Sequence, residues 1–348
     1  AGILYRSEQG EIFENKQRSE QLSNINQIPR ITDYDFRPMD EYVRWSPRGN
    51  GIDRTFSYIT SRGCPFTCEF CSIPEKGQKW RSFDPDRVIS EIEHMVEKYH
   101  VNHIEIEDDN FTLKSKHSIP ILKYLKEFRE KGNPLKLSFP NGVMIDRLDR
   151  EHLFAMKDAG TEIIYLPVES GELKNLIAMN KPAAVEHLEN TLQVAEWCKE
   201  AELDAGAFFI IGYPGGQVVK KSLQNIVHED YADSILEKNN GSMWIKGEDE
   251  ESFMQTVDFA KKLVKAGVKY VTPLIATPYP GTNLYDICEK YGWLRRADFS
   301  SMVTTISYQN PKVEFINIDT PWCSADEAFA RWEYMADIFP VKHNVVKK

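Results

Sequence analysis

The 348-residue sequence carries 43 Lys and Arg against 53 Asp and Glu, a formal net charge of −10, and 41% of its residues are hydrophobic. This composition excludes a collagen-like, low-complexity or largely disordered protein. The acidic balance argues against nucleic-acid binding through a broad basic surface, because neutralising phosphates requires clustered Lys and Arg. The sequence has no run of about 18 apolar residues, so it predicts no membrane span.

Residues 1–54 are predicted to form an irregular N-terminal arm. Two short β-type runs at 3–6 and 11–14 flank a glycine-containing turn and are predicted to pair as a hairpin. The polar, proline-containing stretch that follows is typical of a linker. The sequence begins without Met and has neither the basic nor the apolar region of a signal peptide, so we expect a fragment or a processed form.

From Thr55 onward, short β-type runs alternate with helical periodicity. The β-type runs fall at 58–60, 103–106, 135–139, 163–168, 207–211 and 270–276, and helical patterns separate them. This alternation predicts a parallel sheet with crossover helices, as an open doubly wound sheet or as a full or partial barrel. In each of these forms functional groups gather beyond the carboxyl ends of the strands. Residues 217–251 are predicted to be an insertion, and two more helical patterns follow around 284–291 and 325–338.

Three cysteines, Cys64, Cys68 and Cys71, have the spacing C-x3-C-x2-C directly after the first β-type run. Structural zinc sites and electron-transfer iron–sulfur clusters take four protein ligands. The remaining cysteines are scattered over distant elements: Cys198, Cys288 and Cys323. Three thiolates on a cubane cluster would leave one iron open to an external ligand, as in a reactive site. The alternatives are a zinc loop completed by a remote residue and three thiols without a metal.

This segment resembles the signature of the radical S-adenosylmethionine (SAM) superfamily, in which an aromatic residue, here Phe70, precedes the last cysteine. The resemblance implies a [4Fe-4S] cluster on Cys64, Cys68 and Cys71. It also implies that SAM binds the open iron and that an electron from the cluster cleaves SAM to a 5′-deoxyadenosyl radical. Such radical chemistry belongs to the cofactor, and the protein supplies orientation and exclusion of water.

The resemblance also implies the architecture, an α/β fold with a partial (β/α)6 TIM-like barrel. We expect the N-terminal arm at 1–54, the radical SAM core at 55–283 and a C-terminal helical extension at 284–348. Beyond the second β-type run, Asp108, Asp109 and Asn110 stand where the family places a polar element that receives the methionine ammonium. The alternative for these residues is an acidic loop that caps the next helix.

Further cofactor contacts follow the fourth and fifth β-type runs. Glu169 and Ser170 end the fourth run, where a glutamate can accept hydrogen bonds from ribose hydroxyls. Lys181 lies where related enzymes place a cation on the cofactor carboxylate, although a surface lysine is an equal alternative. Gly212, after the fifth run, resembles the family's glycine-bearing element beneath the adenine. Cys323 could donate a hydrogen atom to a substrate radical, although a buried, inert thiol is the stronger interpretation.

A finer resemblance is to the cobalamin-dependent branch of the superfamily, over roughly residues 1–290. Four stretches carry it: Ile3–Arg6 with Gln27–Pro29, Thr60–Pro65, Glu107–Thr112 with Pro140–Gly142, and Ala276–Gly281. It implies a methyltransferase that uses cobalamin on an unactivated carbon of a small molecule. The cobalamin-binding Asp-x-His-x-x-Gly loop of the usual upstream domain does not occur in 1–348. Either that domain was removed, or the enzyme is a cobalamin-independent epimerase, dehydrogenase or dehydratase. A non-enzymatic metal-cluster module is the third alternative.

The resemblance further implies a partner and a compartment. A flavodoxin or ferredoxin-type reductant must supply electrons to a low-potential cluster, whose potential depends on charge and solvent exposure. We therefore expect a cytoplasmic enzyme, protected from oxygen, with a small-molecule substrate and no nucleic-acid partner.

Overall fold

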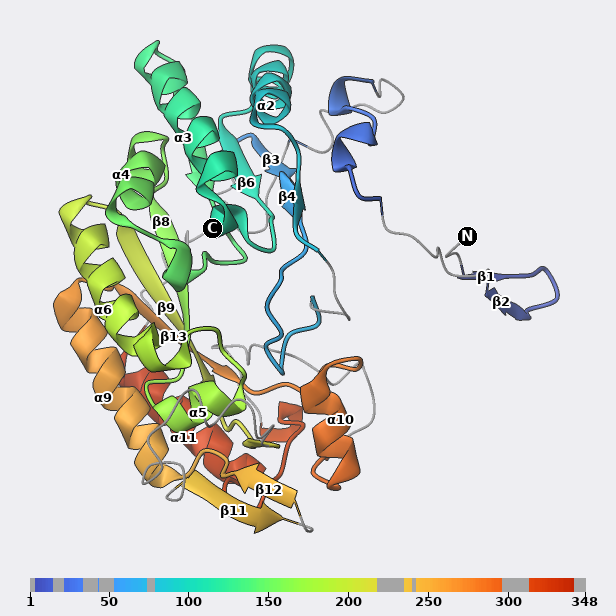
Figure 1. Cartoon of the computed structure of the whole chain (residues 1–348), viewed down its shortest axis with the longest axis vertical. Helices are drawn as coiled ribbons and strands as arrows, with labels where there is room; N and C mark the ends of the chain where they lie inside the picture. Colours follow the sequence, from blue (N-terminus) through green and yellow to red (C-terminus); the bar gives the residue numbers. More distant parts are fainter. Residues whose placement is uncertain are drawn as a thin grey trace, which may run out of the picture.

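The computed structural model describes residues 4–14, 22–33, 43, 53–73, 79–217, 235–239, 242–295 and 313–340. Six strands carry the mixed α/β fold, in two three-stranded sheets ordered β3-β6-β7 and β8-β9-β13 (Figure 1). Their bounds are β3 (Thr55–Tyr58), β6 (His103–Ile106), β7 (Lys136–Ser138), β8 (Ile163–Glu169), β9 (Asp204–Ile211) and β13 (Tyr270–Ile275). All pairs within these sheets are parallel, and one parallel bridge, Leu137 to Thr161, continues from β7 toward β8. Five of the six predicted β-type runs and the parallel order are confirmed, whereas the first run, predicted at 58–60, is misplaced, because β3 already ends at Tyr58.

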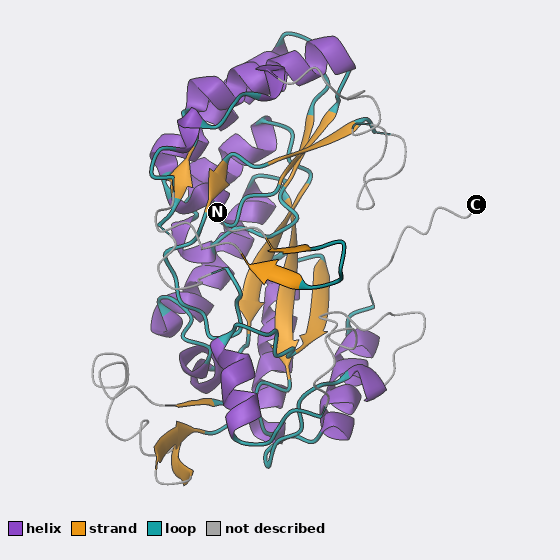
Figure 2. Ribbon diagram, turned by 90° about the vertical axis from the view of Figure 1, so that its right-hand side faces the viewer, coloured by secondary structure: helices purple, strands orange, loops and turns teal. Residues whose placement is uncertain are grey.

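Helices follow these strands, as the alternation predicted; most of them lie along one side of the strands, and the helix before the C-terminal tail lies on the other side (Figure 2). They are α2 (Pro85–Tyr99), α3 (Ser115–Glu130), α4 (Arg150–Asp158), α5 (Leu173–Ala178), α6 (Ala184–Glu200), α9 (Glu250–Ala266), α10 (Asn283–Lys290) and α11 (Ala325–Ile338). Short 3-10 turns complete the described helical structure: η1 (Ile25–Gln27), η2 (Ile31–Asp33), η3 (Phe111–Leu113), η4 (Ile145–Arg147) and η6 (Val313–Phe315). The short helix α5, directly after β8, was not predicted. None of the helices in the described ranges is both long and apolar enough to cross a membrane.

The hydrophobic core lies between the strands and these helices. Because successive strand side chains point to opposite faces, Ile164, Leu166 and Val168 of β8 share the face that packs on the helices, and all three are fully buried. Burying an aliphatic side chain of this size stabilises a fold by about 1.5–3 kcal/mol. The other face of the same strand carries Tyr165, which is only partly buried. We call the face of the strands that carries Tyr165 the inner face; because it is only partly covered, it is available for a ligand.

The C-terminal helix α11 belongs to this core. Trp332 is buried in it and donates its indole N–H to the Pro273 carbonyl of β13 at 3.0 Å. Ser324 caps α11 and exchanges hydrogen bonds with Glu327, a capping box that fixes where the helix begins. The division of the chain at 54/55 and 283/284 stays a prediction, but α11 packs against the last parallel strand as a crossover helix would.

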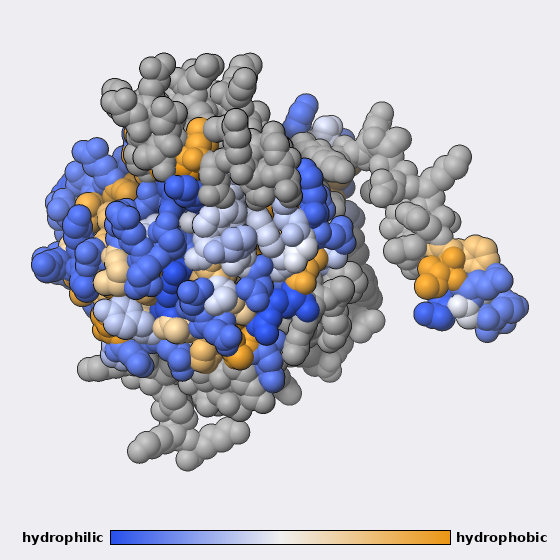
Figure 3. All heavy atoms as spheres, turned by 90° about the horizontal axis from the view of Figure 1, so that it is seen from below, coloured by the Kyte–Doolittle hydropathy of each residue, from blue (hydrophilic) through white to orange (hydrophobic). Residues whose placement is uncertain are grey.

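Three small antiparallel sheets complete the described fold. The predicted N-terminal hairpin is confirmed: β1 (Leu4–Arg6) pairs with β2 (Ile12–Glu14). It stands apart at the right of Figure 3 and exposes Tyr5, Ile12 and Phe13. Within the predicted insertion, β12 (Ser242–Ile245) pairs with both β10 (Gly216–Gln217) and β11 (Leu236–Asn239). The third pair, β4 (Ser61–Arg62) with β5 (Arg81–Ser82), was not predicted and closes the base of the loop that carries the clustered cysteines.

Candidate functional site

The three clustered cysteines lie on one loop beyond β4, at the carboxyl end of the β3-β6-β7 sheet. Gly63, the first residue of this loop, has a φ of 86°, a left-handed conformation that glycine adopts without a steric penalty. Its N–H donates to Asp109 Oδ2 at 2.7 Å, so the start of the loop is fixed to the residues that follow β6. We call residues 63–73 the cysteine loop.

The middle of the cysteine loop is held by two further elements. The Glu69 N–H donates to the Met179 carbonyl at the end of α5 at 3.0 Å. The Glu69 carbonyl in turn accepts from the Leu284 N–H in the first turn of α10 at 2.9 Å. The Asn180 side chain donates from Nδ2 to both the carbonyl and the hydroxyl oxygen of Thr67, each at 2.9 Å. The loop is thus fixed by elements that are far apart in the sequence, and its position does not depend on local turn geometry alone.

All three cysteines of the loop are free thiols and partly exposed. Burial raises the pKa of each thiol, that of Cys68 to about 12, and the neighbouring thiols add to the rise at Cys68 and Cys71. The Lys181 ammonium acts in the opposite direction on all three. Thiolates, which are the metal-binding form, would therefore be stabilised here by Lys181 and by a bound cation.

The three thiols are of the type that iron–sulfur clusters take as ligands. Within the described ranges, no group of three or more His, Cys, Asp and Glu side chains is placed to hold one metal ion. A zinc site needs four ligands about 2.0–2.3 Å from one ion, so the zinc-loop alternative is not supported there. A cubane cluster binds each thiolate through a different iron, and its ligands therefore stand further apart.

The polar residues 108–110 after β6 differ in their contacts: the two aspartates accept hydrogen bonds at the start of the cysteine loop, and the asparagine lies beside Cys64. Asp108 is buried and accepts from the Thr60 N–H at 2.5 Å and from the Thr60 and Ser61 hydroxyls at 2.6 Å. Burial raises the pKa of Asp108 to about 6, although these hydrogen bonds oppose the rise. Asp109 accepts from the Gly63 N–H, as described above. Asp108 therefore fixes the residues directly before the cysteine loop, and Asp109 fixes its first residue. Asn110 is also buried and interacts with the Cys64 thiol, but its Oδ1 atom has no hydrogen-bond partner among the described residues.

An ion pair lies at the carboxyl end of β8. Lys181 Nζ donates to Glu169 Oε1 at 2.7 Å, and each side chain is only 9% exposed. Burial alone would lower the pKa of Lys181, but Glu169 and Cys68 outweigh it and raise that pKa. Glu169 has a φ of 66°, a conformation that costs a non-glycine residue about 1–3 kcal/mol and is concentrated at functional sites. Lys181 is therefore not the surface lysine that the sequence allowed as an alternative.

The other predicted cofactor residues lie near this pair or beside the loop. Ser170 is fully buried, and its hydroxyl accepts from the Glu172 N–H at 3.2 Å and lies 3.2 Å from the Thr256 hydroxyl, which joins the start of α5 to α9. Phe70 is partly buried and packs against a smaller cluster of buried hydrophobic side chains that includes Tyr213 and is separate from the main core. The thiols outside the loop, Cys198, Cys288 and Cys323, are buried, and burial raises the pKa of each to about 12.

Glu248, the hydrogen-bond partner of Gly212, was not predicted from the sequence as a residue near the site. Gly212, with a φ of 75°, donates its N–H to Glu248 Oε1 at 2.9 Å. Glu248 is fully buried, and Arg331 of α11 lies 3.6 Å from the same carboxylate oxygen. Burial raises the pKa of Glu248 to about 7. Glu248 belongs to a charged run, 246–251, which is typical of an exposed insertion, so nothing in the sequence signalled its burial.

Comparison with known families identifies the class of this fold and site. Residues 58–217 match the family described as the radical SAM superfamily. The matched range contains the cysteine loop, Asn110, the Glu169–Lys181 pair and Gly212. This part of the chain is a radical SAM domain, an α/β fold of the TIM-barrel-like kind, and that family uses a [4Fe-4S] cluster and SAM.

Two curated relatives are named as methyltransferases. An uncharacterized methyltransferase of Pyrococcus horikoshii is 30% identical over 287 residues, which are 82% of this chain and 51% of that protein. The cytidylyl-2-hydroxyethylphosphonate methyltransferase of Streptomyces wedmorensis is 32% identical over 165 residues, 46% of this chain and 29% of that protein. The chain thus spans about half the length, or less, of these relatives.

Among solved structures, the chain is similar to the radical SAM methyltransferase TsrM from Kitasatospora setae, whose structure holds cobalamin and a [4Fe-4S] cluster. The TM-score is 0.59 at 16% sequence identity, and the match covers 84% of this chain and 54% of TsrM. At this identity the likeness shows the fold alone.

Proposed function

We propose that Cys64, Cys68 and Cys71 hold a [4Fe-4S] cluster at which SAM is cleaved reductively, and that the chain acts in this way on a small molecule. The observation that carries the proposal is the geometry of the cysteine loop. Hydrogen bonds fix this loop to the end of β6, the end of α5 and the start of α10, and its three free thiols lie near the Lys181 ammonium. We further infer that the two three-stranded sheets form a partial (β/α)6 barrel with this loop beyond its carboxyl ends.

The neighbouring residues supply groups for the polar ends of SAM. Asn110 Oδ1 is a buried acceptor to which the described part of the chain offers no donor, and it suits the methionine ammonium, since Asp108 and Asp109 are engaged with residues 60–63 at the start of the loop. Lys181 suits the SAM carboxylate, and Glu169 can accept from the ribose hydroxyls once Lys181 turns to that carboxylate. Ser170 would act by holding the strand end that carries Glu169, and the backbone at Gly212 would lie beside the adenine.

When bound, the reduced cluster supplies the electron that cleaves SAM into methionine and a 5′-deoxyadenosyl radical. The role of the chain is to orient the two cofactors and to exclude water from them. The anchors on Gly63, Glu69 and Thr67 keep the thiols in place while SAM binds and leaves. Electrons would come from a flavodoxin or ferredoxin-type protein.

For the reaction itself, we propose methyl transfer with cobalamin. The support is that the two relatives described above are named as methyltransferases and that the TsrM structure holds cobalamin. Hydrogen abstraction alone, as in a cobalamin-independent epimerase, dehydrogenase or dehydratase, would yield 5′-deoxyadenosine and no demethylated SAM. The two reactions therefore leave different products from the same cofactor.

The experiment uses the chain reconstituted anaerobically with iron and sulfide and supplied with SAM, hydroxocobalamin and a reductant. Methyl transfer predicts S-adenosylhomocysteine among the SAM products, together with 5′-deoxyadenosine. Cleavage to 5′-deoxyadenosine alone, with cobalamin present, would favour the cobalamin-independent alternative. The matched control is Cys68→Ala, which should give neither product.

A further inference from the structure

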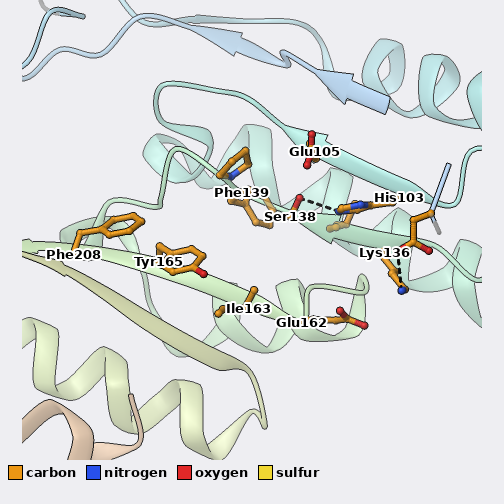
Figure 4. A pocket seen from close by; sticks show the side chains of 12 residues that line it. His103, Glu105, Lys136, Ser138, Phe139, Glu162, Ile163, Tyr165 and Phe208 are labelled. Carbon is orange, nitrogen blue, oxygen red and sulfur yellow. Dashed lines mark hydrogen bonds and ion pairs between the residues drawn. The ribbon is translucent and has the colours of Figure 1, made fainter. Parts of the chain in front are cut away.

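A cavity of about 420 Å³ opens on the inner face of the strands (Figure 4). It takes in the first residues of β6, β7 and β8, and Phe208 of β9 completes its wall. Small-molecule sites in proteins have volumes of about 300–1,000 Å³, so the cavity is large enough for a compact ligand. None of its lining residues was predicted from the sequence to bind a ligand.

One wall of the cavity is polar and ordered. Glu105 of β6 is only 3% exposed and accepts a hydrogen bond from the Ser57 hydroxyl of β3 at 3.0 Å. His103 Nε2 hydrogen-bonds with the Ser138 hydroxyl of β7 at 2.9 Å, and its Nδ1 with the Thr55 hydroxyl at 3.1 Å (Figure 4). These side chains alternate with buried apolar ones along their strands, so strand register holds them on the inner face.

The charges on the lining are mostly negative. Asp53, Glu105 and Glu162 contribute three carboxylates, and Lys136 contributes one ammonium, which pairs with Asp53 Oδ2 at 3.0 Å. Burial lowers the pKa of His103, so its ring is uncharged at neutral pH. On the described part of the lining three carboxylates stand against one ammonium, and this net negative charge favours a cation over an anion.

The opposite wall is aromatic. The rings of Tyr165 and Phe208 are stacked with centroids 4.8 Å apart and planes inclined by 8°. Glycine at 206 makes this arrangement possible, because a Cβ there would lie 2.6 Å from the Tyr165 ring. Stacked rings present a flat apolar surface, on which a planar ligand packs and near which a cation is also attracted.

We propose that this cavity binds a small ligand that carries both a flat ring and a protonated amine, with the ring against Tyr165 and Phe208 and the ammonium toward Glu105. That this ligand is the substrate of the radical reaction rests on the proposed function, whereas the binding itself does not. Glu105 precedes Asp109, the anchor of the cysteine loop, by four residues, which span at most about 14 Å of extended chain. A ligand of this size in the cavity can therefore extend toward the carboxyl ends of the strands.

The test compares two probes of nearly equal size on the purified chain, without iron, SAM or reductant. Tyramine has the ring and the ammonium, and 3-(4-hydroxyphenyl)propionate has the same ring and a carboxylate. Calorimetric titration should show tyramine binding at least about tenfold more tightly, as one charge-assisted contact allows. Equal or tighter binding of the acid, or no binding of either probe, would overturn the proposal.

Variants assign the binding to this cavity. Glu105→Gln should weaken tyramine by about tenfold, and Phe208→Leu should weaken both probes, while Glu130→Gln at the exposed end of α3 should change neither. Tyramine affinity unchanged in Glu105→Gln would contradict the site. If that variant does not fold, the comparison of probes on the unaltered chain still decides. Because no iron or SAM is present, failure here leaves the cluster proposal standing, and loss of the cluster proposal leaves this binding intact.

Discussion

At the carboxyl ends of the parallel strands the reactive groups lie on loops, whereas inside the cavity they lie on the strands themselves. The cysteine loop is fixed by hydrogen bonds from the β6 end, from the α5 end and from α10. Glu105 and His103 need no such anchors, because the register of β3, β6 and β7 sets their positions. The two regions can therefore be altered separately. Hydrogen-bond anchors set the position of the cysteine loop, whereas single inward-facing side chains set the lining of the cavity.

The largest effect is expected from Cys68→Ala. Removing one of three thiolates leaves two irons without a protein ligand, so iron and sulfide should be lost after anaerobic reconstitution. Tyramine binding in the cavity should stay unchanged, because it depends on the other region. Cys198→Ala, a buried thiol far from the loop, is the control and should keep its iron. Full iron content in Cys68→Ala would contradict the ligand assignment.

The next effect concerns the buried pair beside the loop. Lys181→Met leaves the Glu169 carboxylate buried without its cation, which should lower the free energy of unfolding by about 3–5 kcal/mol. The double variant Glu169→Gln with Lys181→Met should recover part of that loss, since both charges are then gone. Urea unfolding measures both. Lys123→Met removes an exposed pair with Glu151 and should cost no more than about 1 kcal/mol. An equally small loss at Lys181 would show that the pair is not buried as described.

A smaller change separates the cavity from the core. Gly206→Ala places a methyl group against the Tyr165 ring, and overpacking of this kind costs about 1–3 kcal/mol. The displaced ring should also weaken tyramine binding. Ala207→Gly, on the fully buried face of the same strand, should cost about 0.5–1 kcal/mol and leave tyramine affinity unchanged. Loss of affinity in both variants would mean that strand stability, not the aromatic wall, controls binding.

The smallest effect, judged over a single pH unit, depends on the protonation of Glu248. The pKa of Glu248 is raised by burial from 4.5 to about 7, so between these values the folded chain binds more protons than the unfolded chain. Its contribution to stability is therefore present below pH 4.5 and is lost as pH rises toward 7, with a slope of up to about 1.4 kcal/mol per pH unit. Glu248→Gln should remove that component from the pH dependence of urea unfolding. Identical slopes in the variant and the unaltered chain would contradict the burial of this carboxylate.

The parallel order of the strands and the cysteine loop could be predicted, because hydrophobic periodicity and close cysteine spacing are local signals. The anchors could not: Met179, Asn180 and Leu284 meet the loop only through tertiary packing. The different roles of the residues after β6 could not be predicted either, because Asp108, Asp109 and Asn110 are adjacent and similar in sequence. In the structure Asp108 and Asp109 fix the start of the loop, whereas Asn110 Oδ1 has no hydrogen-bond donor among the described residues.

The cavity was missed for a different reason. His103 and Glu105 form an ordinary polar and apolar alternation, which predicts a half-exposed strand as readily as a ligand site. Only pairing with the neighbouring strands brings Ser57 and Ser138 beside them. The short strands β4 and β5, two residues each, are likewise too short for a periodic signal, yet they close the cysteine loop.

The most direct measurement is the fate of SAM on the anaerobically reconstituted chain under a strong reductant. We expect 5′-deoxyadenosine and methionine in equal amounts, dependent on iron and abolished in Cys64→Ala, Cys68→Ala and Cys71→Ala alike. Intact SAM in the presence of a fully loaded, reduced cluster would contradict it, as would cleavage that persists when any one of these thiols is gone.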